Sequence, residues 1–301
     1  MTPTSGPATT VPVATVAARL HRSSMGRRRH VTDLGMRGLT LLAALACTVP
    51  LAAVLGFVVV NGIGAVNLDL ILKGPKALGI GGGAANAIVG TLQMVPLAAL
   101  LAVPFGVLGA VYASEFADRR SASIIRFAAD VMVGVPSILI GIFVFTILVL
   151  PFKQFNAFAG SVALAVIMVP VVLRTTEVAL NLVPGTLREA SLALGVPVWR
   201  TALSVVLRTG LTGILTGVML AFARAMGETA PLLFTALGSR LVNIGNFTRP
   251  MDALPIFIYV NARQPNAVLN QQAWGAAFLL LLVVLVINVS VRARSWGRRV
   301  G

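Results

Sequence analysis

The sequence of 301 residues is poor in cysteine, histidine and charge. Its single cysteine, Cys47, excludes an intrachain disulfide and a cluster of thiolate metal ligands. Both histidines, His21 and His30, precede the first long apolar run, so we expect neither a serine–histidine pair nor a histidine metal site in the apolar body. Charged residues make up 11% of the chain, against about 25% in soluble domains, which excludes a soluble enzyme or a secreted scaffold.

Sequence motifs of enzymes are also missing. The three lysines, Lys73, Lys76 and Lys153, lie outside any G-x-x-x-x-G-K-[ST] phosphate loop. The sequence contains neither a G-x-S-x-G nor an H-E-x-x-H motif. We therefore expect no catalysis by this chain, and no ATP, metal or other cofactor bound to it.

Apolar runs, in contrast, are abundant, and 57% of the residues are hydrophobic. Six runs have the composition and approximate length of helices that cross a bilayer. They span residues 39–60, 86–112, 128–150, 158–173, 209–237 and 274–291. The sequence thus predicts an all-α membrane protein, with a transmembrane domain over residues 38–301 that contains six transmembrane helices.

Residues 1–37 differ in composition from the rest of the chain. They are rich in Thr, Pro, Ala and Ser and then in Arg, with little apolar surface to bury, which predicts a disordered basic tail. The apolar run that follows is longer than the apolar core of a signal peptide. We therefore interpret residues 39–60 as an uncleaved first transmembrane helix.

The distribution of basic residues predicts the orientation of the helices. Seventeen of the 24 Lys and Arg residues fall in the two termini and in the loops after the second and fourth runs. Because cytoplasmic loops are enriched in basic residues, both termini are expected in the cytoplasm of a multi-pass protein of the plasma or inner membrane, in contact with lipid. The net charge of +15 does not indicate nucleic-acid binding, since no basic face with interleaved aromatic residues is present.

The loop between the fourth and fifth runs contains the signals of a short helix. Pro184 and Gly185 end the preceding helix, and Thr186 and Glu189 have the spacing of a capping box. Gly195 is placed to end the short helix. Such a segment is either a well-capped surface turn or a docking helix that inserts into a partner.

The fifth run contains two charges, Arg224 and Glu228, four residues apart. Inserting each of these charges at the centre of a transmembrane helix costs about 2.5–3.5 kcal/mol of free energy, which indicates that the pair has a structural or a functional role. One interpretation is a neutralising ion pair. The other is an anion site, in which the guanidinium binds oxyanion oxygens and Glu228 orients it or excludes anions without a proton to donate.

Two further charges lie near the membrane boundary predicted for their runs. Arg174 follows the fourth run, where it is either a positive-inside anchor or a residue of the anion exit path. Asp130, near the start of the third run, is expected to be a capping or interface residue.

The loop after the fourth run carries a family signature. Glu189-Ala190-Ser191, followed after three residues by Gly195, resembles the E-A-A-x-x-x-G signature of type I ABC importer permeases. Ser191 replaces the second Ala of that signature, and Arg208 stands where the family has a final Pro. In this family the loop forms a coupling helix, here about 187–195, that sits in a groove of the ATPase. The resemblance implies this role for Arg188, Glu189, Ala190, Ser191 and Gly195.

A second resemblance concerns the substrate. The fifth run reads Ala-Arg-Ala-Met-Gly-Glu-Thr-Ala-Pro-Leu-Leu, which is similar to the A-R-x-x-G-E-T-A-P-L-L segment of the phosphate-importer permease family PstA. Residues 134–137 and 171–177 also resemble that family, and the likeness covers about 86–291. It implies a type I ABC importer permease fold that forms half of a phosphate pore, with Arg224, Glu228 and Arg174 in the translocation path.

The same resemblance implies partners that carry out the steps this chain lacks. They are a PstC-type sister permease, a PstB-type ATPase dimer that binds ATP and Mg, and an external phosphate-binding protein. The residues leave three alternatives open. The chain could be a permease for another oxyanion such as molybdate, sulfate or phosphonate, an anion channel or carrier that works without ATP, or a structural or sensory membrane subunit.

Overall fold

The computed structural model describes residues 24–76 and 80–297. The chain separates into two compact units, Met1–Phe57 and Val58–Gly301. We describe each unit by itself.

The first unit consists of most of α2 (Ser24–Gly62), a helix of 39 residues that contains Pro50. Because α2 begins at Ser24, residues 24–37 are helical, although the sequence predicts disorder there; residues 1–23 of the expected tail lie outside the described residues. The side chains of residues 29–57 in this unit are exposed, although most of them are apolar. The length and the apolar composition of α2 are those of a helix that crosses a membrane.

In its described residues, 58–76 and 80–297, the second unit contains four long helices, several shorter ones and single 3-10 or π-helical turns. The long helices are α4 (Ala85–Val111), α7 (Ala157–Asn181), α10 (Leu207–Met226) and α13 (Ala267–Gly297). The short helices are α3 (Leu68–Leu72), α5 (Arg119–Gly134), α6 (Ser137–Val144), α8 (Gly185–Ala193), α9 (Val198–Thr201), α11 (Ala230–Thr235) and α12 (Leu254–Ala262). The 3-10 turn is η1 (Ile63–Ala65), and the π-helical turns are η3 (Tyr112–Phe116), η4 (Phe145–Val149) and η5 (Ala202–Val206).

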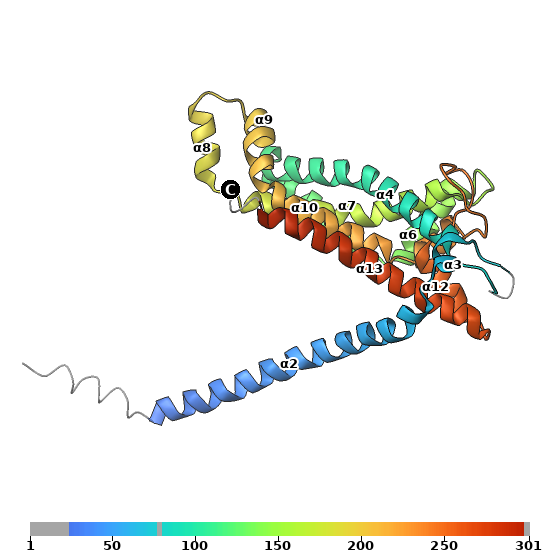
Figure 1. The fold of residues 1–301 in the computed structure, drawn as a ribbon. Helices are drawn as coiled ribbons and strands as arrows, with labels where there is room; N and C mark the ends of the chain where they lie inside the picture. Colours follow the sequence, from blue (N-terminus) through green and yellow to red (C-terminus); the bar gives the residue numbers. More distant parts are fainter. Residues whose placement is uncertain (1–23, 77–79, 298–301) are drawn as a thin grey trace, which may run out of the picture. The chain divides into compact units, whose positions relative to one another are not determined.

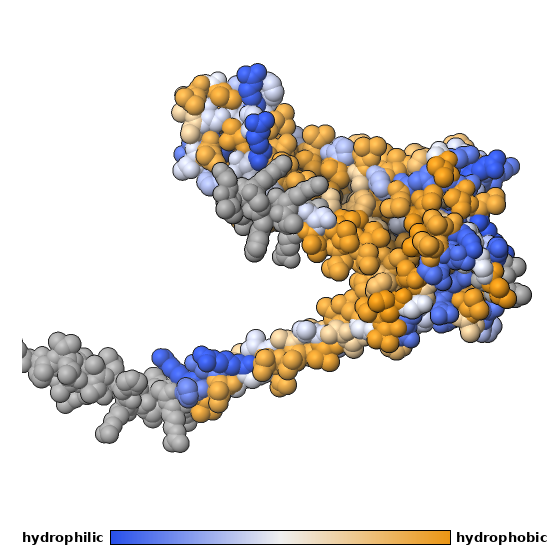
Figure 2. Space-filling model, in the orientation of Figure 1, coloured by the Kyte–Doolittle hydropathy of each residue, from blue (hydrophilic) through white to orange (hydrophobic). Residues whose placement is uncertain are grey.

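Helix α7 lies at the centre of this unit, with α4 and α10 packed along it (Figure 1). The fully buried Met94, Leu164, Met168 and Val172 form the middle of the core. Glycines allow the close approach, because a Cβ at Gly217 of α10 would collide with the side chain of Thr175. Hydrophobic side chains cover the middle of the unit, between its α8 end and its α3–α12 end. Hydrophilic side chains gather at the α3–α12 end (Figure 2).

The prediction of an all-α membrane fold is confirmed. Five helices among the described residues are long and apolar enough to cross a membrane, or six if one bent pair counts as a span. That pair corresponds to the third predicted run, where Arg119–Gly134 and Ser137–Val149 meet at 100°. The cause is Pro136, which holds the preceding Val135 in the extended region and so ends α5.

Two other predicted helix ends are wrong. Helix α7 continues to Asn181, so Arg174 lies inside it and not at its end. The fifth run is two helices and not one, because α10 ends at Met226 and α11 begins at Ala230. Gly227 caps α10, and Pro231 in the first turn of α11 cannot continue the α10 hydrogen bonds.

A polar loop over residues 237–252 connects α11 to α12 at the end of the unit away from α8. The side chain of Gln93 on α4 donates to Asn243 O (2.8 Å) and accepts from Gly245 N (2.6 Å). Thr91 Oγ1, also on α4, accepts a hydrogen bond from Leu254 N at 2.8 Å. These side chains of α4 therefore hold the loop against the helical core.

Candidate functional site

Arg224 and Glu228 lie at the break between α10 and α11. Arg224 is in the last turn of α10, where the partial negative charge of the helix C-terminus favours a cation. Its Nε is 3.4 Å from Glu228 Oε1. Gly141 of α6 makes the room for this break, since a Cβ there would be 2.6 Å from the Cα of Pro231 in α11. The missing side chain of Gly141 thus allows α6 to pack closely against the start of α11.

The Arg224–Glu228 pair is open toward its surroundings. The Arg224 side chain is 43% exposed, whereas that of Glu228 is 16% exposed. Among the described residues, Glu228 is the only ion-pair partner of Arg224, and it contacts Nε. The two terminal nitrogens therefore remain available for a planar, two-point contact with an oxyanion.

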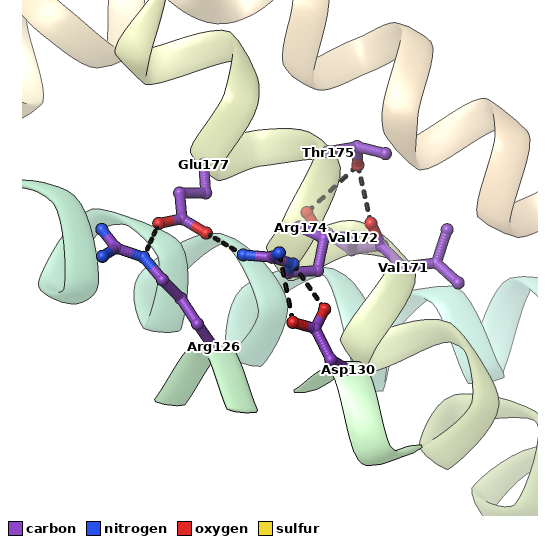
Figure 3. A network of polar contacts seen from close by, with 7 residues as sticks. All are labelled: Arg126, Asp130, Val171, Val172, Arg174, Thr175 and Glu177. Atoms are coloured by element: carbon purple, nitrogen blue, oxygen red, sulfur yellow. Dashed lines mark hydrogen bonds and ion pairs between the residues drawn. The ribbon is translucent and has the colours of Figure 1, made fainter. Parts of the chain in front are cut away.

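Arg174 belongs to a different cluster, which joins α5 to α7 (Figure 3). Its Nε is 2.9 Å from Asp130 Oδ1, and one terminal nitrogen is 3.3 Å from Asp130 Oδ2. The other terminal nitrogen is 2.8 Å from Glu177 Oε2. Arg126 Nε contacts Glu177 Oε1, so both oxygens of this carboxylate are paired. Asp130 is thus an interface residue, which confirms one of its two predicted roles.

We call Arg126, Asp130, Arg174 and Glu177 the α5–α7 network. Its two cations and two anions balance, and the Glu177 side chain is 4% exposed. Every guanidinium nitrogen of Arg174 already has a carboxylate partner. These contacts favour a role for Arg174 in joining two helices over a direct contact with substrate.

The two clusters also lie at different levels of the helical unit. Gly217 of α10 packs beside Thr175 of α7, which follows Arg174. Seven residues of helix separate Gly217 from Arg224, or about 10 Å along the axis at 1.5 Å per residue. The structure therefore does not place the three predicted translocation residues in one group.

Helix α8 corresponds to the predicted coupling helix, but the predicted capping box is wrong. The N-cap is Pro184, and no side chain caps the helix, so Thr186 and Glu189 do not form the reciprocal bonds. Helix α7 ends at Asn181, and α8 begins at Gly185 directly after Pro184, which lies outside the helical region with ψ 135°.

Arg188 fixes α8 to the rest of the unit. It lies 2.8 Å from Glu115 Oε1 and donates to the carbonyls of Val183 (2.7 Å) and Leu180 (2.9 Å). Its side chain is 24% exposed and that of Glu115 is 10% exposed. Arg188 therefore faces the unit and positions α8, whereas Glu189 and Ala190 are exposed.

The C-terminal end of α8 is defined by backbone and side-chain hydrogen bonds. Gly195 has φ +76°, its N–H donates to Leu192 O, and Val196 N donates to Ser191 O. This is a Schellman motif, in which the left-handed residue is almost always glycine. The buried Ser191 hydroxyl is 2.9 Å from that of Thr201 in α9, so Ser191 supports the loop from inside.

The outer surface of α8 and α9 is rich in exposed apolar side chains. Leu194 is 84% exposed, and the others are between 41% and 54% exposed. They are Leu187, Leu192, Val198 and Trp199. Together with Glu189 and Ala190, they form a mixed surface of the kind that docks another protein.

The sequence did not predict Arg126 or Glu115 as parts of these clusters. Each is a charge at the edge of an apolar segment, which is the only signal it gives in the sequence. Among the described residues, no group of three or more His, Cys, Asp or Glu side chains could hold a metal ion.

Comparison with known proteins shows the family to which the chain belongs. Residues 102–293 match the family described as "Binding-protein-dependent transport system inner membrane component". The phosphate transport system permease protein PstA of Pasteurella multocida is 40% identical over 258 residues, which cover 85% of this chain and 92% of the relative. This chain belongs to the PstA permease family.

Other members of the PstA family are equally similar. The PstA 1 protein of Mycobacterium tuberculosis strain H37Rv is 42% identical over 221 residues, covering 73% of this chain and 71% of the relative. The solved inward-facing structure of the MetNI methionine ABC transporter has a chain with TM-score 0.56 at 19% identity. That match covers 71% of this chain and 94% of the other, and it confirms the type I ABC importer permease fold.

Proposed function

We propose that this chain is the membrane permease subunit of an ATP-driven importer of inorganic phosphate and forms half of its pore. The observation that carries the proposal is the open Arg224–Glu228 pair at the break after α10, in a chain similar to PstA proteins. Broken helices near a membrane-embedded site are a common way to expose binding groups to substrate. A channel without ATP and a permease for another oxyanion are not favoured by these relatives.

In the proposed transport step, Arg224 binds phosphate oxygens through its two terminal nitrogens. Glu228 holds the guanidinium by Nε, which leaves the two terminal nitrogens for the anion. The carboxylate also disfavours anions that have no proton to donate. The α5–α7 network holds α5 against α7, and in this proposal Arg174 joins these two helices and does not bind the substrate.

Helix α8 is the proposed contact with the ATPase subunit. Arg188 joins it to Glu115 after α4 and to the end of α7, so a push on α8 reaches two long helices directly. Glu189, Ala190 and the exposed leucines supply the contact surface. Gly195 and Ser191 set the shape of the loop that carries it.

The proposed assembly also contains a sister permease of the PstC type, two PstB-type ATPase subunits and an external phosphate-binding protein. ATP and Mg belong to the ATPase. A motor is needed because a divalent anion that enters against an inside-negative potential costs about 2.3 kcal/mol per charge per 100 mV. Both termini and α8 lie on the cytoplasmic side in this proposal, in agreement with the bias of basic residues.

The experiment that tests the function is uptake of labelled phosphate by cells that lack this chain. Restoring the chain should restore uptake, and an excess of sulfate or molybdate should not compete. In the purified transporter, phosphate with the binding protein should stimulate ATP hydrolysis. Restored uptake of sulfate or molybdate instead of phosphate, or phosphate uptake that does not need ATP, would contradict the proposal.

A further inference from the structure

A pocket of about 310 Å³ lies at the end of the second unit away from α8. This volume is at the lower end of the range of small-molecule sites. The segment after α3, the turn after α11 and helix α12 form its walls. The polar groups that line it are Lys76, Ser239, Arg240, Asp252, Asn261 and Gln264.

Two cations at this pocket have no acidic partner. Lys76 and Arg240 are exposed, and neither makes an ion pair with another described residue. Neighbouring cations are occupied, since Lys73 lies 2.7 Å from Asp69 and Arg263 donates to the Tyr259 hydroxyl at 2.7 Å. Lys76 and Arg240 therefore bring two positive charges without an acidic partner to the wall of the pocket.

Asp252 supplies a single carboxylate to the wall. It is 8% exposed, its Oδ2 accepts from Asn86 Nδ2 at 2.9 Å, and its Oδ1 accepts from Ala253 N at 2.9 Å. A carboxylate oxygen has two acceptor sites, so each oxygen retains one for a ligand. Burial raises the pKa of Asp252 to about 6, which leaves the group mainly ionised at pH 7.

The backbone of the wall is held in an uncommon conformation. Leu237 and Gly238 are both left-handed, with φ +59° and +88°, and Leu237 is an unusual residue in that region. Asn86 Nδ2 donates to Ser239 O at 2.6 Å, so the same amide holds both the turn and Asp252. A strained turn that is fixed by a buried amide is a feature of binding sites more often than of plain loops.

We propose that this pocket is a second anion site, which takes a protonated oxyanion such as hydrogen phosphate on its way to Arg224. Lys76 and Arg240 attract the anion, and Asp252 accepts a hydrogen bond from its P–OH group. Sulfate carries no proton at neutral pH, so the Asp252 carboxylate repels it. The inference rests on the proposed function, because it assigns the site to the same substrate.

The test uses a local probe in the complete transporter. In a Cys47→Ala background, Ser239→Cys places a thiol in the pocket wall, and the measurement is the rate of its modification by an impermeant maleimide. Phosphate should slow modification and sulfate should not. Arg240→Gln should weaken the protection about tenfold, which is the size expected for one charge-assisted hydrogen bond. Arg263→Gln is the matched control and should change nothing, since Arg263 contacts Tyr259.

Asp252→Asn sharpens the test, because it keeps the shape of the side chain and removes its charge. In this variant sulfate should protect the thiol nearly as well as phosphate. If Asp252→Asn fails to fold, Arg240→Gln and Lys76→Gln still test the site, because both change exposed side chains.

Three results would overturn the inference. In the first, phosphate does not slow modification of the thiol at position 239. In the second, phosphate and sulfate slow it equally with Asp252 in place. In the third, phosphate slows it only when the external binding protein is present, which would mean that a protein contact covers the thiol. Phosphate uptake, measured in the same cells, tests the proposed function separately: normal uptake without protection rejects only the second site.

Discussion

The α5–α7 network and the Arg224–Glu228 pair both place charge within apolar helices, yet they differ in how completely the charges are paired. The arginine side chains are similarly exposed, 38% for Arg174 and 43% for Arg224. Arg174 has carboxylate partners on all its guanidinium nitrogens, whereas Arg224 has one partner on Nε. Pairing, and not exposure, separates a charge that joins helices from one that is available to a substrate.

The backbone also differs between the two clusters: it is regular helix at the α5–α7 network and broken at the Arg224–Glu228 pair. The α5–α7 network joins regions of regular helix, and its acid Glu177 is buried. The Arg224–Glu228 pair spans the point where α10 ends and α11 has not begun. The proposed function uses this difference: the paired network joins two helices, while the open pair at the break can exchange its contact for one with phosphate.

The largest effect is expected for Arg224→Gln, which removes the charge of the open pair. Loss of the charged contact to the bound anion costs about 2–5 kcal/mol, so phosphate uptake should fall at least about thirtyfold. Arg224→Lys should recover part of the loss, because an ammonium keeps the charge without the planar fork. The measurement is labelled phosphate uptake, and normal uptake by Arg224→Gln would place Arg224 with the structural pairs.

Glu177→Ala should break the α5–α7 network and leave Arg126 and Arg174 without their shared partner. Removal of one member of a buried ion pair costs up to about 3–5 kcal/mol, so less transporter should be recovered and its melting temperature should fall. Uptake per recovered transporter should stay close to that of the unmodified protein. A stable transporter with little uptake would show that this network takes part in translocation.

Arg188→Gln should weaken the connection of α8 to Glu115 and to the end of α7. Loss of one charge-assisted contact is worth about 1.5–3 kcal/mol, so stimulation of ATP hydrolysis by phosphate should fall at least about tenfold. The ATPase subunit should still co-purify, because Arg188 faces this chain. Loss of the ATPase subunit from the complex would mean that Arg188 contacts it directly.

The smallest effect is expected for Glu228→Gln. The amide can still accept a hydrogen bond from Arg224 Nε, so orientation of the guanidinium is partly kept. Uptake should fall by a factor of about three to ten, in line with about 0.5–1.5 kcal/mol for one hydrogen bond. A loss as large as that of Arg224→Gln would assign Glu228 a direct part in gating.

The sequence predicts those features that depend on neighbouring residues. Apolar runs mark the long helices, and the spacing of four residues pairs Arg224 with Glu228. Pro136, Gly227 and Pro231 are visible in the sequence as breaking signals, but membrane helices often tolerate such residues. The structure shows which of these signals act: α5 ends before Pro136, and α10 ends at Met226, before Gly227 and Pro231, where Gly141 allows the close contact with α11.

Contacts between distant residues could not be predicted from a single sequence. Arg126 and Glu177 are 51 residues apart, Arg188 and Glu115 are 73 apart, and Asn86 and Asp252 are 166 apart. The sequence assigned Arg174 to the translocation path because its position matches a family segment. Its role depends on whether α5 brings Asp130 to it, which only the folded chain reveals.

The most direct test of the account compares the same substitution in the two clusters. Arg224→Gln and Arg174→Gln each remove one charge, and the measurement is phosphate uptake divided by the amount of assembled transporter recovered. The account predicts that Arg224→Gln assembles normally and loses uptake per transporter, whereas Arg174→Gln assembles less well and keeps it. Loss of uptake per transporter in Arg174→Gln, with normal uptake in Arg224→Gln, would contradict the claim that pairing distinguishes the two arginines.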